Sequence, residues 1–338
     1  MYELFYILGS YLKEFSFLFF IAFLLGSTVL GFFLLTKGGD LLSDYCSIFA
    51  ERLGVPPVVI GLTIVSVATS APELFTSIAA INSSAGGLVL GNITGSNVAN
   101  IGLILGISLL IKPISTHNAV APVQLILLAI ATLGFSFAIA LNQNSELGML
   151  TGLVLILFII FYLSGLCITS LKKRSQLPAL TQDSDKEQSS LLIVTLMIFV
   201  GGILLWIGSE SLVYGSKNLA ELAGVPSELI GFTLIAIGTS LPELAASISL
   251  LKKDETQMLL GNIIGSNIFN IGLVGGVAGI LGPIESESPY PWIDHFSMII
   301  FTSILIFWMR GKNLSSKNGF SLLVLYLLAS VTTWVANS

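Results

Sequence analysis

Two stretches of this sequence, GLTIVSVATSAPELFTSIAA (Gly61 to Ala80) and GFTLIAIGTSLPELAASISL (Gly231 to Leu250), decide its fold. Aligned without a gap they match at 9 of 20 positions, and the offset between their glutamates, Glu73 and Glu243, is 243 − 73 = 170. Each glutamate lies inside a long apolar run, and a charged carboxylate at bilayer depth costs about 3 kcal/mol or more. Such a residue is rarely present without a function, so the pair predicts a site within a membrane.

A second pair of stretches keeps the same offset: GNITGSNVANIGLILG (Gly91 to Gly106) and GNIIGSNIFNIGLVGG (Gly261 to Gly276), identical at 11 of 16 positions. We therefore interpret the chain as a duplication. The predicted organisation is a first membrane repeat over residues 1–170 with motifs in 61–106, a linker over 171–190, and a second membrane repeat over 191–338 with motifs in 231–276.

The composition supports a membrane protein. Of the 338 residues, 54% are hydrophobic and 10% are charged, and the mean hydropathy is +0.94. An average soluble domain has roughly 25% charged residues. Apolar segments of about 20 residues, enough to cross a bilayer, recur along the chain. The sequence therefore predicts a multi-pass membrane protein with no room for a large soluble domain.

Ten membrane spans fit the apolar segments, five in each half. The first and sixth, about Phe17 to Leu53 and about Leu191 to Leu222, are unusually long. A helix of about 30 residues exceeds the thickness of the membrane core, so both are expected to tilt strongly or to run along the interface. The other predicted spans are Val58 to Asn82, Leu88 to Leu110, Ala119 to Leu141, Leu147 to Ser170, Glu228 to Leu251, Met258 to Leu281, Trp292 to Met309 and Gly319 to Val335.

The basic residues predict the orientation. Lys172, Lys173 and Arg174 lie in the linker, and the positive-inside rule places this loop in the cytoplasm. Most other Lys and Arg residues then fall inside, and both termini are expected outside. Because each half has an odd number of spans, the second half enters from the opposite side, which makes an inverted repeat. Inverted repeats place the substrate site near the middle of the membrane, between the copies.

One face of each predicted helix carries only oxygen donors. Ser66, Thr69, Ser70 and Glu73 stand at i, i+3, i+4 and i+7, which is one face of a helix. The second half repeats this face with Ala236, Thr239, Ser240 and Glu243, so an alanine replaces the first serine. Hydroxyl and carboxylate oxygens suit hard cations such as Ca²⁺ or Na⁺.

Prolines add free carbonyls to this face. Pro72 and Pro242 lack an N–H, so the carbonyls of Ala68 and Gly238, one turn earlier, lose their normal donor. In a membrane such a break is tolerated only beside protein, water or a ligand. A cation is a natural partner for the freed carbonyl.

The second motif offers further polar side chains. Asn92, Ser96 and Asn100 lie at i, i+4 and i+8, and Asn262, Ser266 and Asn270 repeat the spacing. The serines and the last asparagine of each set can complete a coordination shell opposite the glutamates. For Asn92 and Asn262, and for Asn97 and Asn267, helix capping or interhelical hydrogen bonding is as good an interpretation as ligation.

Two glutamates that face one cavity repel each other, and one divalent or two monovalent ions would cancel their charge. Without an ion, one of them is expected to take up a proton. One cation must then replace another, which predicts ion exchange. Outside this site, Asp40 and Glu210 are expected to face water or to pair with Lys37 or Lys217, and His295 is expected in a loop or at the membrane interface.

The two pairs of motifs in this sequence closely resemble those of the Ca²⁺/cation antiporter superfamily, specifically the prokaryotic sodium/calcium exchangers. The motifs that carry the resemblance are ATSAPEL (Ala68 to Leu74) with GTSLPEL (Gly238 to Leu244), and GNITGSN (Gly91 to Asn97) with GNIIGSN (Gly261 to Asn267). The resemblance implies an all-α membrane protein of ten transmembrane helices in two inverted five-helix repeats. It also implies exchange of Na⁺ for Ca²⁺ across the cell membrane, with no enzyme activity, no cofactor and function as a monomer.

The resemblance further implies a ligand set and a transport motion. The long first and sixth helices would slide across a fixed core, so that the site opens to each side in turn. The implied ligands are Glu73 and Glu243 with the side chains of Thr69, Ser70, Thr239, Ser240, Ser96 and Ser266, and the backbone carbonyls of Ser66 and Ala236; Asn100 and Asn270 complete the predicted site.

One departure leaves the coupling ion open. Some members of the superfamily have Asp at the position of Asn270, so this site has one ionisable group fewer than those relatives. The alternative function is a proton- or potassium-coupled antiporter of calcium or another divalent cation. A channel is a further alternative, but long tilted helices and broken spans favour a carrier. The chain has no HExxH or GxGD motif, which disfavours an intramembrane enzyme.

Overall fold

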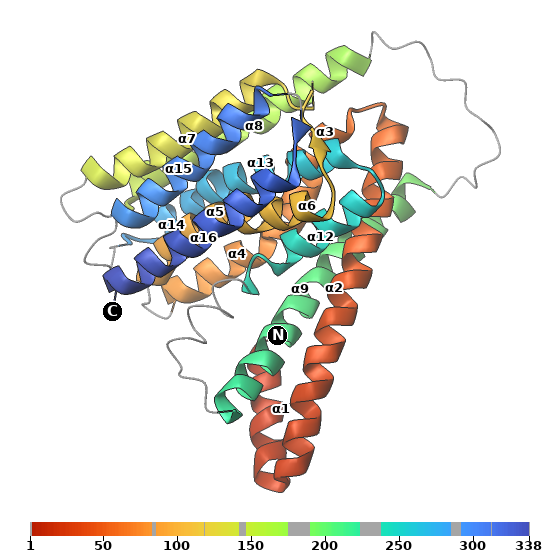
Figure 1. Ribbon diagram of the computed structural model, residues 1–338, viewed down its shortest axis with the longest axis vertical. Helices are drawn as coiled ribbons and strands as arrows, with labels where there is room; N and C mark the ends of the chain where they lie inside the picture. The colour runs from red at the N-terminus through yellow and green to blue at the C-terminus, as the bar shows by residue number, and fades with distance from the viewer. Residues whose placement is uncertain are drawn as a thin grey trace.

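The structure is a computed structural model that describes residues 2–82, 86–117, 119–141, 147–174, 190–223, 238–284, 292–311 and 313–337. It is nearly all helical, as predicted (Figure 1). Within the described residues, eight helices are long and apolar enough to cross a membrane. They are Phe17–Leu53, Pro57–Asn82, Leu88–Ile111, Pro122–Ala140, Met149–Ser170, Leu191–Leu222, Thr256–Leu281 and Trp292–Met309.

These eight agree with eight of the ten predicted spans. The two long helices, α2 (Phe17–Leu53) and α9 (Leu191–Leu222), begin and end at the predicted residues. The predicted span from Glu228 to Leu251 starts outside the described residues, and only its second part is seen, as α12 (Leu241–Lys252). The tenth is present as α16 (Ser316–Asn337) but is not among the eight. The count of ten spans and their inverted arrangement therefore stay predictions.

The two long helices pack against each other in opposite directions. Gly31 of α2 faces Gly208 of α9, and a Cβ atom on Gly31 would lie 2.7 Å from the Gly208 carbonyl oxygen. Gly38 faces Gly201, and a Cβ atom on Gly38 would lie 3.0 Å from the Gly201 oxygen. The offset of 170 relates Gly31 to Gly201 and Gly38 to Gly208, so the contact is reciprocal between the halves.

A short additional helix, α1 (Tyr2–Phe15), precedes α2 and was not among the predicted elements. Ser16, which has an extended backbone, separates the two helices. The α1 helix packs on the long pair through aromatic side chains, with the Phe5 ring 5.6 Å from Tyr214 of α9 and 6.2 Å from Phe23 of α2. In Figure 1, α1 and the adjoining parts of α2 and α9 extend away from the other helices.

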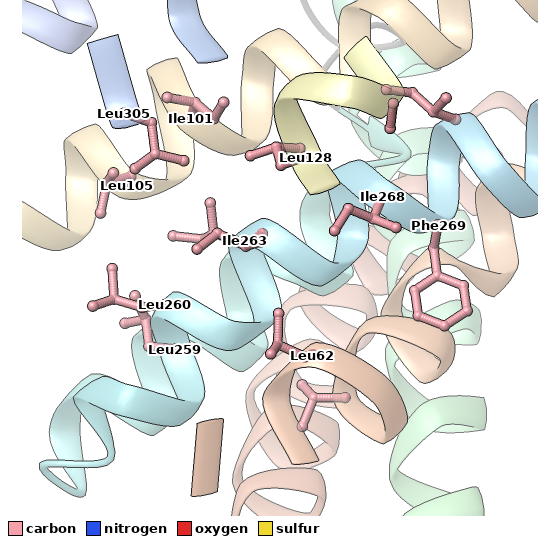
Figure 2. Packing of buried hydrophobic residues seen from close by; sticks show 14 of the residues in the cluster. Leu62, Ile101, Leu105, Leu128, Leu259, Leu260, Ile263, Ile268, Phe269 and Leu305 are labelled. Carbon is pink, nitrogen blue, oxygen red and sulfur yellow. The ribbon is translucent and has the colours of Figure 1, made fainter. Parts of the chain in front are cut away.

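The remaining helices surround α13 (Thr256–Phe269), whose residues from Met258 to Phe269 are all buried. Figure 2 shows its side chains packed against Leu62, Leu128 and Leu305 from three other segments. Beside it lie α4 (Ser66–Asn82) and α5 (Gly86–Ala99). The other elements here are α3 (Pro57–Ile60), α6 (Gly106–Ile111), α14 (Gly275–Leu281) and the π-helical turns η1 (Gly61–Val65), η2 (Asn100–Leu105) and η4 (Asn270–Val274).

Outer helices and loop contacts complete the fold. The helices are α7 (Pro122–Leu141), α8 (Met149–Arg174) and α15 (Trp292–Met309). The α8 helix continues from Leu171 to Arg174 into the predicted linker 171–190, and 175–189 lie outside the described residues. Among the described residues, the β-structure consists of the antiparallel pair β1 (Ile114–Ser115) and β2 (Asn313–Leu314) and a single bridge between Leu147 and Ile284.

Candidate cation-binding site

The two glutamates lie together in the interior. Glu73 is on α4 and Glu243 is in the first turn of α12, and each is only 1% exposed. The two carboxyl groups interact electrostatically. The Ser70 hydroxyl of α4 donates a hydrogen bond to Oε1 of Glu243 at 2.9 Å, which links the two halves at the site.

Most of the carboxylate oxygens are left without a protein donor. Within the described part of the chain, both oxygens of Glu73 and Oε2 of Glu243 are buried without a hydrogen-bond partner, as is the Ser240 hydroxyl. Buried polar atoms are nearly always paired, because an unpaired one costs roughly 1–3 kcal/mol and a charged one more. These oxygens are therefore suited to receive a cation.

The hydroxyls beside the glutamates are held by reciprocal contacts between the halves. Thr69 donates to Oδ1 of Asn262 at 3.3 Å, and Thr239 donates to Oδ1 of Asn92 at 3.4 Å. The offset of 170 relates both members of the first bond to both members of the second. The same asparagine oxygens accept from the serines one helical turn later, from Ser96 at 3.4 Å and from Ser266 at 3.5 Å.

The asparagines at the start of each second motif also bind the first motif of the same half. Asn92 donates to the Ser77 hydroxyl at 3.1 Å, and Asn262 donates to the Ser247 hydroxyl at 3.4 Å. Asn92 donates in addition to the backbone carbonyl of Glu73 at 3.2 Å. These two asparagines therefore hold the glutamate helices in place, and every contact named here is interhelical hydrogen bonding.

Four further asparagines form a crossed set, with Asn97 in α5 and Asn267 in α13, and with Asn100 and Asn270 at the first positions of η2 and η4. Asn100 donates to Oδ1 of Asn267 at 3.0 Å, and Asn270 donates to Oδ1 of Asn97 at 3.4 Å. Oδ1 of Asn100 and Oδ1 of Asn270 are buried and have no partner among the described residues. Both predicted site asparagines thus keep one acceptor oxygen available.

The proline breaks differ between the halves. Pro242 lies in the first turn of α12, and Thr239 and Ser240 directly before this helix are not α-helical, as expected. The freed carbonyl of Gly238 accepts a 2.6 Å hydrogen bond from Ser209 of α9, a partner that the sequence did not predict. Pro72, in contrast, lies inside the continuous helix α4, so the predicted break at this position is wrong. The local irregularity is instead the π-helical turn η1, just before α4.

Two predicted backbone ligands remain. Ser66 is fully buried, and its hydroxyl donates to the carbonyls of Gly61 at 2.7 Å and Asn262 at 3.1 Å. Its own carbonyl lies within 3.4 Å of the Thr69 hydroxyl. Ala236, the matching position in the second half, lies outside the described residues.

The structure thus gathers the predicted side chains in one region. The donors there are carboxylate, hydroxyl and amide oxygens, which bind hard cations. Sequence reasoning missed the role of Ser209 and left that of Asn92 and Asn262 undecided. The offset of 170 is the sequence feature that indicates a shared role for Asn92 and Asn262. It relates the threonine and serine that contact Asn92 to those that contact Asn262.

Two residues outside the site have contacts that the sequence did not predict. His295 lies within α15 and is 8% exposed, with its ring 5.6 Å from that of Phe135, because this helix begins at Trp292 and packs on α7. Asp40 does not pair with Lys37: Ser249 of α12 donates to its carboxylate at 2.8 Å. This contact joins α2 to a helix that the sequence did not place beside it.

The chain is similar to known proteins over most of its length. A family model described as sodium/calcium exchanger protein matches residues 18–167 and 193–335. The sodium/calcium exchanger MaX1 of Methanosarcina acetivorans is 35% identical, over 88% of this chain and 95% of that protein. The inner membrane protein YrbG of Escherichia coli is 32% identical, over 84% and 88%.

The fold is also similar to solved structures. A structure of the sodium-calcium exchanger NCX_Mj, soaked with 2.5 mM Na⁺ and 0.1 mM Sr²⁺, superposes with a TM-score of 0.79 at 28% sequence identity. The match covers 92% of this chain and 99% of that one. Helix α1 ends before residue 18, the first residue that the family model matches.

Proposed function

Since this chain belongs to the sodium/calcium exchanger protein family, a family of membrane antiporters, we propose that it exchanges Na⁺ for Ca²⁺ with the ions bound between Glu73 and Glu243. The observation that carries the proposal is the pair of buried carboxylates, one from each half, whose charges interact. Three of their four oxygens have no hydrogen-bond partner in the described part of the chain.

The charge of the pair supports exchange. Two carboxylates in a site of low dielectric repel strongly, and an uncompensated buried charge costs several kcal/mol. One Ca²⁺ neutralises both, and so do two Na⁺. Because either ion relieves the same repulsion, the two compete for one set of oxygens. Crossing the membrane with the site loaded is then favoured over crossing with the site empty, which is the requirement for antiport.

The proposed ligands are arranged around both carboxylates. Asn92 and Asn262 hold the hydroxyls of Thr239 and Thr69 in fixed places, and Ser70 already contacts Glu243. A cation would replace the weak contacts among these groups with shorter bonds to their oxygens. The full proposed set is Glu73, Glu243, Thr69, Ser70, Thr239, Ser240, Ser96, Ser266, Asn100 and Asn270, with the carbonyls of Ser66 and Ala236.

The long helices supply the proposed motion. The α2 and α9 pair is joined along glycine contacts, and α1 packs on both, so these three helices can move as one unit against the others. Alternating access then follows from sliding of this unit over the core that carries the site. The proposed orientation places the loop at residues 171–190 in the cytoplasm and both termini outside, and the proposed transporter acts as a monomer without a cofactor.

Measurement of Ca²⁺ uptake into proteoliposomes identifies the coupling ion. We expect uptake of radioactive Ca²⁺ when Na⁺ is trapped inside, and none when Li⁺ or K⁺ replaces it or when a proton gradient is imposed without Na⁺. Uptake driven by the proton gradient alone would reject Na⁺ coupling and leave the proton-coupled alternative. A dependence on K⁺ in addition to Na⁺ would support the potassium-coupled alternative.

A further inference from the structure

A polar cluster fastens one of the long helices to the helix that carries Glu243. The cluster consists of Asp40 and Asp44 on α2, Ser249 in the last turn of α12, and Lys253 directly after this helix. Ser249 donates to the Asp40 carboxylate at 2.8 Å, and the Lys253 ammonium donates to the Asp40 backbone carbonyl at 2.8 Å. The same ammonium lies 2.6 Å from the Asp44 carboxylate. We call these four residues the α2–α12 latch.

The backbones of the two helices touch beside the latch. A Cβ atom on Gly39 would lie 2.8 Å from the carbonyl oxygen of Ala245, so α2 lies directly on α12 at this point. Lys253 is partly buried there, with 29% of its side chain exposed, whereas Asp44 is 58% exposed. The latch therefore closes over a contact that is already tight.

The residues of the latch are not repeated in the other half of the sequence. At the offset of 170, the counterparts of Ser249 and Lys253 are Ala79 and Ser83, and the counterpart of Asp44 is Tyr214. An alanine side chain carries no donor, and neither a serine nor a tyrosine at these positions can form the ion pair. Only Asp40 has an acidic counterpart, Glu210.

The corresponding helices, α9 and α4, are also packed differently. They meet through stacked rings of Phe75 and Trp206, 5.2 Å apart. At Gly202 of α9, a Cβ atom would have ordinary contact with Ala68, at 3.5 Å. Thus α2 contacts α12 through an ion pair and a close backbone approach, and the described contacts of α9 with α4 include a stacked pair of rings.

We propose that the α2–α12 latch is a one-sided lock, which holds the transporter closed at the end of α12 that carries Lys253. A transporter built from two matched halves has one state open to each side of the membrane. When it changes from one state to the other, the contacts of α2 with α12 are replaced by those of α9 with α4. An interaction present in only one of these pairs stabilises one state over the other. The inference rests on the alternating access proposed above, and the basic end of α12 is the one predicted to face the cytoplasm.

The expected size of the bias is modest. The ion pair is partly exposed, so solvent screens it, and a pair of this kind shifts a two-state population by about fivefold. High salt should weaken the ion pair and shift the population in the same direction as its removal.

The test measures the distance between α2 and the core helices, and it does not depend on transport activity. Spin labels are attached to cysteines that replace Val29, an exposed residue of α2, and Gln257, an exposed residue at the start of α13. Cys167 is replaced by serine, and Cys46 is fully buried. Double electron–electron resonance then gives the distribution of distances between the long helix and the core, in detergent and in nanodiscs.

We expect two distances, one for the state with the latch formed and one for the state with α2 released from α12. Lys253→Gln and Ser249→Ala should raise the population of the released state by about fivefold, and Lys252→Gln should leave it unchanged. Lys252→Gln is the matched control, because this substitution removes the same charge from the exposed neighbouring position. The exchange of Asp44→Lys with Lys253→Asp restores the ion pair but not the bond to the Asp40 carbonyl, so it should return the distribution part of the way. An unchanged distribution in both latch variants, or an equal shift in Lys252→Gln, would overturn the proposal, whereas loss of Na⁺-driven flux with an intact shift would count against Na⁺ coupling alone.

Discussion

At the scale of single residues, the site depends on which buried oxygens already have donors. Ser70 satisfies one oxygen of Glu243, while the equivalent Ser240 has no partner among the described residues and Glu73 accepts from no side chain there. The two chemically equal carboxylates are therefore unequal in this structure. An ion that enters gains most from the oxygens of Glu73.

Ser209 is the residue outside the predicted ligand set that we expect to matter most. Its hydrogen bond is the contact that occupies the carbonyl of Gly238, directly before Thr239 and Ser240. Ser209→Ala would leave a buried acceptor unpaired at a cost of about 1–3 kcal/mol, so this segment should shift. We expect about a tenfold rise in the KM for Ca²⁺ in vesicle uptake, with recovery in Ser209→Thr.

The matched control is Ser211→Ala, two positions further along α9. Ser211 is also buried, but its hydroxyl has no partner among the described residues. Its removal should leave the KM unchanged. Equal effects of the two substitutions, or no rescue by threonine, would mean that Ser209 acts only through packing.

At the scale of elements, the close contact of α2 with α9 is the feature that makes a single moving unit. A Cβ atom on Gly31 would approach the Gly208 carbonyl to 2.7 Å. Gly31→Ala should therefore force the helices apart, at about 1–3 kcal/mol, and lower the melting temperature of the purified protein. Differential scanning fluorimetry in detergent measures this.

Gly26→Ala on the same helix is the control, because a Cβ atom there would meet nothing within 4 Å. Alanine favours a helix more than glycine does, so this variant should melt at the same or a higher temperature. If both variants melted alike, the glycine contact would not be what holds the pair together.

The elements also show where sequence reasoning succeeds. The predicted ends of α2 and α9 agree with the structure to the residue, because each helix begins directly after a serine and α2 ends at Gly54, which has a left-handed backbone. The helix α1 was missed, because its 14 residues are too few to span a membrane and its stability comes from aromatic contacts with α2 and α9. The break expected at Pro72 is wrong, because a proline removes only one hydrogen bond of a helix and α4 continues through it.

At the scale of the whole molecule, the offset of 170 between the halves carried most of the prediction. It pairs the glutamates, the threonines and the asparagines, and the contacts of the threonines with the asparagines are reciprocal in the structure. Thr132 even lies 3.4 Å from Thr302, its own counterpart. What the repeat could not predict is where the halves differ, as at Ser209 and the α2–α12 latch, because such differences break the pattern that makes prediction possible.

The whole-molecule prediction concerns competition between the ions. Since one Ca²⁺ and two Na⁺ neutralise the same two carboxylates, added Na⁺ should displace bound Ca²⁺ more steeply than in a one-for-one exchange. Titration of bound radioactive Ca²⁺ with NaCl, at constant ionic strength held with choline chloride, measures the slope. Displacement by choline itself, or no displacement by Na⁺, would show that the ions do not share the site.

Equilibrium binding of radioactive Ca²⁺ to the purified Glu73→Gln and Glu243→Gln variants is the most direct test of a site between the two glutamates. Glu51→Gln, which removes an exposed carboxylate from α2, is the control. Because each substitution at the site removes one of two buried charges, we predict a loss of affinity of about 100-fold or more in both, and none in the control. Ca²⁺ binding of unchanged affinity in either site variant would contradict the account.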